Sequence, residues 1–242
     1  MRILHFSDLH GVAMRLAEST IEAVQPDWIV LTGDMLPDFG RLPGEYRRLT
    51  AQREWWRTWR SSFLHEGIRT TFVRGNHEIE DFEDRSLRIV PVEMAGLAGF
   101  LEGIPARWVT WGYSREWNDD ALKEEVDAMG EPLVVLSHAP PFGWLDLNSS
   151  GDHIGHPALR EFLDPSEEAL IRTLASRNWI PKPPSLVMCG HVHQSFGHER
   201  HGPTLVVNAA TGFAVIDFDL DSGVARVRRM ERLLVGRPDP YL

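Results

Sequence analysis

Five short apolar runs, each followed at once by a polar side chain, constrain the fold of this sequence more than any other feature. Every run is rich in Val, Ile, Leu or Phe and ends in Gly or Ser followed by Asp, Asn or His. The runs and their endings lie at residues 2–11, 27–34, 69–78, 133–138 and 185–193. Runs of this kind are typical of strands in a sheet that is covered on both faces, because neither face then meets water.

Helical segments separate these predicted strands. The stretch 12–24 has apolar residues at helical spacing, and Pro26 lies just past its end. Further helices are predicted at about 45–66, 119–129 and 166–178. Strands that alternate with helices indicate a layered α/β fold.

The C-terminal part has a different pattern. The stretches 204–208, 213–219 and 224–230 are predicted to be consecutive strands, with a turn at Asp221-Ser222-Gly223. Because no helix is predicted between them, we expect an antiparallel meander there.

The polar residues that follow the runs are predicted to meet in space, since ligands of open α/β sheets bind beyond the carboxyl ends of the strands. They are Asp8, His10, Asp34, Asn76, His77, His138, His191 and His193. This set offers oxygen and imidazole ligands without a thiolate, which suits Mn, Fe or Zn. Seven or more ligands exceed the need of one ion, so the set indicates two divalent metal ions.

Charge limits the partners that we expect. The formal net charge is -10 and the sequence pI is near 5.5. Extended nucleic acid is therefore not an expected partner, because binding it needs clustered Lys and Arg. A small phosphorylated substrate remains compatible with an acidic chain, since a metal ion can supply the local positive charge.

Length and cysteine content indicate the number of domains and the cellular compartment that we expect. The 242 residues, 43% of them hydrophobic, are expected to form a single domain over residues 1–242. The one cysteine, Cys189, lies in an apolar run and is expected to be a small buried core residue. Because the sequence shows no disulfide pair, no signal peptide and no bilayer-spanning stretch, we expect a cytoplasmic protein without a membrane partner.

The motifs at the five strand ends resemble those of the calcineurin-like metallophosphoesterases. In order they are DLH (8–10), GD (33–34), GNHE (75–78), the histidine of SHAPP (137–141) and GHVH (190–193). The resemblance covers residues 2 to about 210 and is closest to the small single-domain phosphodiesterases, through SHAPPFGWLD and the later GHPAL. It implies the α/β (α+β) class and a four-layer αββα sandwich, with two mixed β-sheets flanked by helices.

The resemblance also implies roles for the polar residues. One ion would be bound by Asp8, His10 and His193, the other by Asn76, His138 and His191, with Asp34 bridging the two. His77 would be the catalytic residue, facing the leaving-group oxygen as a proton donor. The implied reaction is hydrolysis of a small phosphate ester, in the first place a phosphodiester, by a hydroxide that bridges the metal ions.

Other functions stay open at this point. A phosphomonoesterase or protein phosphatase of the same superfamily is the main alternative, because SDLHG and RGNHE are close to the protein phosphatase motifs. A DNA-processing nuclease is disfavoured by the short acidic chain. A non-catalytic metal-binding scaffold is disfavoured because every ligand position holds a competent residue.

Several features have two interpretations. Many relatives have an Asp three residues after the bridging Asp, whereas this chain has Pro37 there and Asp38 next, so it is open whether Asp38 orients His77. The stretch 142–157 is either a plain surface loop or a substrate-facing one. The roles of Arg74, His153 and His156 are open. The tryptophans of REWWRTWR (53–60) are predicted to pack on a helix rather than to stack on bases.

Overall fold

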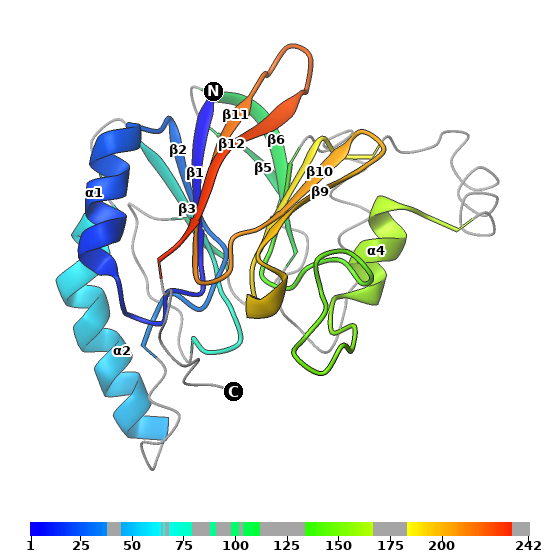
Figure 1. Cartoon of the computed structure of the whole chain (residues 1–242). Coiled ribbons are helices and arrows are strands. Elements are labelled where there is room, and N and C mark those ends of the chain that lie inside the picture. The colour runs from blue at the N-terminus through cyan, green and yellow to red at the C-terminus, as the bar shows by residue number, and fades with distance from the viewer. Residues whose placement is uncertain are drawn as a thin grey trace.

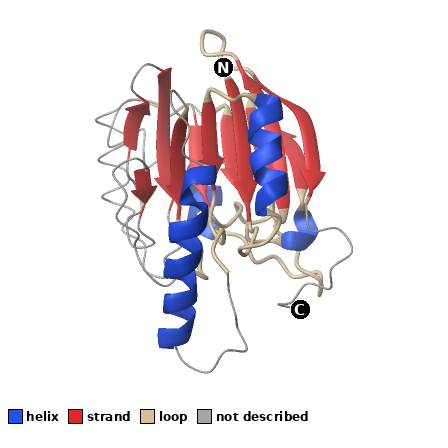
Figure 2. Ribbon diagram, turned by 90° about the vertical axis from the view of Figure 1, so that its left-hand side faces the viewer, coloured by secondary structure: helices blue, strands red, loops and turns tan. Residues whose placement is uncertain are grey.

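Two mixed β-sheets lie face to face with helices on their outer sides (Figure 1, Figure 2). The computed structural model describes residues 1–37, 45–63, 65, 68–78, 88–90, 98–101, 104–111, 134–166 and 183–233. Over these residues the arrangement confirms the expected αββα sandwich with mixed sheets.

In the described residues the first sheet has six strands, in the order β12-β11-β1-β2-β3-β4. Its strands are β1 (Arg2–Ser7), β2 (Trp28–Leu31), β3 (Arg69–Val73), β4 (Arg88–Val90), β11 (Gly212–Phe218) and β12 (Ala225–Arg232). Strands β1 to β4 are parallel to one another, while β11 is antiparallel to both β1 and β12.

The second sheet, over the part of the chain that the structure describes, also has six strands, in the order β5-β6-β7-β8-β10-β9. Its strands are β5 (Ala98–Leu101), β6 (Ile104–Trp111), β7 (Val134–Ser137), β8 (Leu186–Cys189), β9 (Gly197–His201) and β10 (Thr204–Asn208). Strands β6, β7, β8 and β10 are parallel, and β5 and β9 are the antiparallel edges.

The helices cover the outer faces. Helices α1 (Met14–Val24) and α2 (Glu45–Trp59), followed by η1 (Arg60–Ser62), lie beside the first sheet, and α4 (Pro157–Leu163) lies beside the second (Figure 1). The helices predicted at 12–24 and 45–66 are thus confirmed with shorter ends. The predicted helix 119–129, and the predicted helix 166–178 from residue 167 on, lie outside the described residues. No helix in the described part of the chain is long and apolar enough to cross a bilayer.

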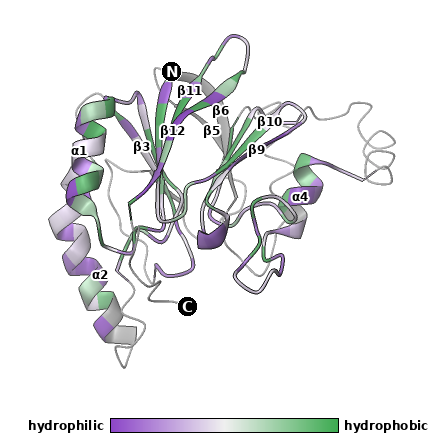
Figure 3. Ribbon diagram, in the orientation of Figure 1, coloured by the Kyte–Doolittle hydropathy of each residue, from purple (hydrophilic) through white to green (hydrophobic). Residues whose placement is uncertain are grey.

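Side chains of the buried strands alternate between two apolar layers, as the strands' period of two requires. On β1, Leu4 packs in the layer under α1 and α2, whereas Ile3 packs between the sheets. On β8, Met188 lies between the sheets and Cys189 lies on the α4 side. Many strand residues are coloured green, for hydrophobic, in Figure 3, because these strands are apolar on both faces. Cys189 is buried, so the prediction for this residue is confirmed.

The tryptophans of α2 pack on the first sheet. Trp55 and Trp56 are 9% and 6% exposed, and the Trp56 ring stacks on Phe72 with centroids 6.0 Å apart. Trp55 also donates a hydrogen bond from its indole to the carbonyl of Gly11, at 3.1 Å. The packing interpretation of this segment is therefore confirmed for these two residues.

The expected C-terminal meander is wrong in its first strand. Strand β10 belongs to the second sheet, where it is parallel to β8 and antiparallel to β9, so of the three predicted strands only β11 and β12 pair with each other. The chain crosses between the sheets at 209–211, where Ala209 and Ala210 are buried and Thr211 adopts a positive φ of 65°. A short link of small residues can make this crossing, and its length alone resembles that of a hairpin turn.

Candidate metal centre

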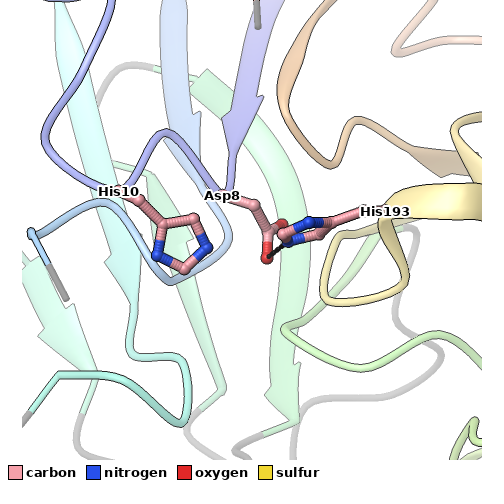
Figure 4. A group of neighbouring side chains, drawn as sticks. All are labelled: Asp8, His10 and His193. Carbon is pink, nitrogen blue, oxygen red and sulfur yellow. Dashed lines mark ion pairs between the residues drawn. The ribbon is translucent and has the colours of Figure 1, made fainter. Parts of the chain in front are cut away.

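Two groups of side chains gather where β1, β2, β7 and β8 end. The first is Asp8, His10 and His193, and the second is Asp34, His138 and His191. Within each group the possible ligand atoms all lie within 4.8 Å of one another. Figure 4 shows the first group, with Asp8 between the two imidazoles and ion-paired to His193. Six predicted ligands that are far apart in the sequence are thus brought together.

Asp8 is fully buried and directed by its neighbours. Its Oδ2 atom accepts hydrogen bonds from the Ser7 hydroxyl, at 2.5 Å, and from the backbone N–H of His191, at 2.9 Å. Its Oδ1 atom faces the His193 Nε2 atom at 3.3 Å. Apart from His193, no residue that the structure describes hydrogen-bonds to Oδ1, so this oxygen is directed into the centre of the group.

Backbone strain marks the same residues. Asp8, His10, Asp34 and His191 have φ values of 54°, 46°, 51° and 67°. Such left-handed conformations are uncommon for residues other than glycine and cost free energy, so they persist only where the surroundings enforce them. Their concentration at the strand ends indicates a functional site.

Two glycines allow the loops to approach closely. A Cβ atom on Gly75 would lie 2.1 Å from Asp34 Oδ1, and one on Gly190 would lie 2.2 Å from Asp8 Oδ2. Both contacts are too short for any side chain. The glycines of the GNHE and GHVH motifs therefore make room for the carboxylates that follow β2 and β1.

His138 is held in one orientation. Its Nδ1 atom lies 2.7 Å from the carbonyl oxygen of Thr32, which can only accept, so Nδ1 carries the hydrogen. Its Nε2 atom lies 3.3 Å from Asp34 Oδ2 and 2.9 Å from Asn76 Oδ1. A backbone acceptor behind a histidine is the usual arrangement that fixes a metal ligand, with the second nitrogen facing the ion.

The electrostatics favour a cation at this place. Burial works to lower the pKa of His138, but the Asp34 carboxylate outweighs it and raises the pKa to about 10. For Asp34, burial works to raise the pKa, yet the field and hydrogen bond of His138 bring it well below its usual range. The carboxylates thus hold a proton on His138 that a bound cation could replace.

Two other histidines are kept neutral. Burial lowers the pKa of His191 to about 4, with the positive charge of His138 acting in the same direction. Burial also lowers the pKa of His10, although the Asp34 and Asp8 carboxylates oppose this effect. Neutral imidazole is the form that binds metal ions, so these environments suit ligands.

The remaining two predicted site residues lie beside the second group. The exposed Asn76 contacts His138 through its side-chain oxygen, as described above. His77 donates its backbone N–H to Asp34 Oδ1 at 2.9 Å, and its Nε2 atom lies 3.8 Å from Asp34 Oδ2. The His77 ring also lies 5.2 Å from that of His10, between centroids, so it borders both groups.

Sequence reasoning gave no role to Glu78, which the structure buries beside the second group. Its carboxylate accepts four backbone N–H groups, from Asp34, Met35, Leu36 and Gly75. Burial and the negative charge of Asp34 raise the pKa of Glu78 to about 7, while the N–H donors oppose the shift. The available signal was a charged residue in the GNHE motif of the loop that follows β3.

The residues left open by the sequence have local partners. Arg74 donates a hydrogen bond to the carbonyl of Glu78 at 2.7 Å. His153 pairs with the buried Asp146 at 2.6 Å inside the 142–157 loop, and His156 precedes α4 as its N-cap residue. Asp38 lies outside the described residues, so its relation to His77 stays a prediction.

The donor set fits divalent metal ions. Each group joins a buried carboxylate to two imidazoles, and Asp8 Oδ1, Asp34 Oδ2 and His138 Nε2 are all directed inward by contacts behind them. The ligands are oxygen and nitrogen without thiolate, a composition that suits Mn, Fe or Zn. With Asn76 beside His138, the two groups have donors enough for two ions.

Comparisons with known proteins agree with this geometry. The protein-family model of the calcineurin-like phosphoesterases matches residues 1–195. No curated protein sequence matches significantly.

Solved structures are similar over nearly the whole chain. One has a TM-score of 0.60 at 16% identity, covering 95% of this chain and 99% of its own. A Thermus thermophilus protein has a TM-score of 0.53 at 15% identity, covering 96% and 98%. A dimetal phosphatase from Danio rerio has a TM-score of 0.54 at 14% identity, covering 89% and 92%. Identities this low show the fold alone.

Proposed function

The chain belongs to the calcineurin-like phosphoesterases, and on that premise we propose that it is a dinuclear metal-dependent hydrolase of small phosphate esters, with phosphodiesters preferred. The observation that carries the proposal is the pair of carboxylate–imidazole groups at the ends of β1, β2, β7 and β8. The fold brings them together from both sheets, which a purely structural role would not require.

In this proposal Asp8, His10 and His193 hold one ion, Asn76, His138 and His191 hold the other, and Asp34 lies between them. Two bound divalent ions would supply positive charge to the phosphoryl oxygens and lower the pKa of bound water. Asp34 Oδ2 lies 3.3 Å from His138 Nε2 in the second group, and the Asp34 carbonyl accepts the backbone N–H of His10 in the first group at 2.9 Å, which supports its place between the groups. The ordinary chemistry of the donors leaves Mn, Fe and Zn as candidates.

His77 is the proposed proton donor to the departing oxygen. It borders both groups, and its side chain is 27% exposed, so a substrate can reach it. Its backbone N–H bond to Asp34 fixes its distance from the centre. A protonated imidazole in this place can give its proton to the departing oxygen.

The preference for diesters rests on the SHAPPFGWLD-to-GHPAL stretch, which resembles the small phosphodiesterases. In the structure this stretch is a tightly closed loop whose Asp146 accepts N–H groups from Gly143 and Gly155. The Ser195 hydroxyl binds the carbonyl of Leu147 at 2.9 Å, and so ties the loop to the turn that carries His193. A loop in this place can border the second organic group of a diester.

A phosphomonoesterase is the second candidate, because SDLHG and RGNHE are close to protein phosphatase motifs and a similar fold is described for a dimetal phosphatase. A non-catalytic metal-binding scaffold stays the third. We also propose a small phosphorylated substrate rather than nucleic acid, and a cytoplasmic location, with which the buried free thiol of Cys189 is compatible.

One assay separates these candidates. The chain, reconstituted with Mn²⁺, is given bis-p-nitrophenyl phosphate, a cyclic nucleotide diester and p-nitrophenyl phosphate at equal concentration. Faster cleavage of the diesters is expected. Faster cleavage of p-nitrophenyl phosphate would replace the diesterase by the phosphatase, and metal uptake without cleavage of any of the three would favour the scaffold.

A further inference from the structure

The loop after β2 and the loop after β3 meet around the buried carboxylate of Glu78. Glu78 is 4% exposed, and its Oε2 atom accepts N–H groups from Asp34, at 2.9 Å, and Gly75, at 2.7 Å. Its Oε1 atom accepts N–H groups from Met35, at 2.7 Å, and Leu36, at 3.1 Å. Three of these donors belong to the first loop and one to the second.

From these contacts we infer that Glu78 is a positioning residue that joins the two metal-ligand loops and sets Asp34 at the centre of the site. The inference rests on the proposed function, because it assigns Glu78 a role toward the metal ions. Glu78 reaches no substrate in this role. It acts through the backbone of Asp34 and through the loop that carries Asn76 and His77.

The loop after β1 is also connected to the backbone that Glu78 holds. The backbone N–H groups of Asp8, His10 and Gly11 bind the carbonyls of Gly33, Asp34 and Met35, at 3.0, 2.9 and 2.8 Å. The β1 loop is therefore attached to the same backbone segment that Glu78 holds. A change at Glu78 is expected to move Asp34 first and the Asp8 group through it.

Only a carboxylate can satisfy this set of donors. A glutamine has one acceptor oxygen, and its NH₂ group would face two N–H groups in either orientation of the amide. Two buried N–H groups would then lose their partners, which the loops can avoid only by separating. Glu78→Gln thus keeps size and shape while removing the contact.

Asp146 offers a matched control. It is 1% exposed, and its Oδ2 atom accepts N–H groups from Gly143 and Gly155, at 2.9 and 3.0 Å. Asp146→Asn therefore removes a buried carboxylate from a loop that carries no proposed ligand, although its amide can keep one oxygen toward the two N–H groups and turn its NH₂ group to His153 Nδ1. A general effect of losing a buried carboxylate should appear in both variants.

The experiment compares full-length wild type, Glu78→Gln and Asp146→Asn. In metal-free protein, hydrogen exchange at the amides of residues 34–36 and 75 should become at least about 10-fold faster in Glu78→Gln and stay unchanged in Asp146→Asn. In Mn²⁺ titrations, the affinity of Glu78→Gln should fall about 10–100-fold, the range measured for residues that orient metal ligands. Excess Mn²⁺ should restore part of its activity, and Asp146→Asn should keep the wild-type affinity.

The inference is overturned if folded Glu78→Gln binds Mn²⁺ as the wild type does, or if both variants lose affinity equally. If Glu78→Gln does not fold, Glu78→Asp replaces it, since the shorter carboxylate reaches fewer donors and should give intermediate losses; wild-type behaviour of that variant overturns the inference. A wild type that takes up no Mn²⁺ would instead refute the proposed function, and the amide exchange alone then decides the role of Glu78.

Discussion

At the scale of single residues, His77 is the side chain whose chemistry is easiest to isolate. It lies beside both ligand groups without belonging to either. Replacing it with alanine should keep two bound metal ions and slow hydrolysis of a substrate with a poor leaving group by on the order of 10²–10⁴-fold. The loss should be smaller for p-nitrophenyl esters, because p-nitrophenolate leaves without a proton.

The control for His77→Ala is His198→Ala, an exposed histidine on the edge strand β9. This variant should hydrolyse both substrates at the wild-type rate. Equal losses on both substrates in His77→Ala would contradict proton donation and indicate that His77 binds the phosphate instead.

His5 allows a prediction about pH. It is fully buried on β1, with its Nε2 atom 2.8 Å from the Thr32 hydroxyl. Burial lowers the pKa of His5 to about 3, although the Asp8 charge opposes the shift. The unfolded chain binds this proton near pH ~6.5, so the stabilisation is complete above that pH and is lost as the pH falls from about 6.5 toward 3.

The size of the His5 effect follows from the same linkage. Between pH 7.5 and 5.0, His5 should account for about 2 kcal/mol of the fall in the free energy of unfolding. Metal-free His5→Gln, compared with the wild type by urea unfolding at both pH values, should therefore lose about 2 kcal/mol less than the wild type over this interval. Equal losses in the two proteins would show that His5 takes up its proton in the folded state.

At the scale of the elements, the sequence predicted the strand ends better than their pairing. A short apolar run and a polar residue after Gly or Ser are local signals, so the ends that carry Asp8, Asp34 and His138 could be placed. The pairing of β10 with β8 is a contact across the fold. Nothing in the short 209–211 link distinguishes a crossing between sheets from a hairpin turn, which explains the wrong meander.

Within the site too, local signals could be predicted and contacts between distant segments could not. Ligand types could be predicted because a metal ion demands particular side chains in any fold. Glu78 could not be assigned, because its partners are backbone N–H groups of Asp34, Met35 and Leu36, which every sequence offers. Roles that depend on backbone partners become visible only in the structure.

The 142–157 loop carries the prediction about substrate preference. Phe142, Leu147 and Ile154 are 41%, 45% and 42% exposed, while the loop itself is held by the buried Asp146. A rigid loop that presents apolar side chains beside a metal centre is suited to contact an organic group. The double variant Leu147→Ser/Ile154→Ser should raise KM for bis-p-nitrophenyl phosphate several-fold and leave metal binding unchanged.

Leu16→Ser is the matched control for this variant. Leu16 is 52% exposed on α1, which covers the outer face of the first sheet. Removing one exposed leucine there should change neither KM nor stability by much. If the loop variant also keeps its KM for the diester and for p-nitrophenyl phosphate, the loop is a plain surface loop.

At the scale of the whole molecule, the proposed ligands come from both sheets. Asp8, His10 and Asp34 follow strands of the first sheet, whereas His138, His191 and His193 follow strands of the second. Each group contains residues from both sheets, so each bound ion would join the two halves of the sandwich. Metal binding should then stabilise the folded chain as a unit, which is what the prediction of one domain over residues 1–242 requires.

This linkage is measurable. An ion that binds only the folded state stabilises it by about 2.7 kcal/mol at a concentration 100 times its Kd. Chelation should therefore lower Tm, and Mn²⁺ should raise it again until two ions per chain are bound, by elemental analysis. Because both ions span the sheets, near-ultraviolet and far-ultraviolet circular dichroism should show one coincident transition with and without metal. Two results would contradict ligation across the sheets. One is a Tm that does not respond to metal. The other is two separate transitions of which only one responds, since one half would then unfold independently of the ions.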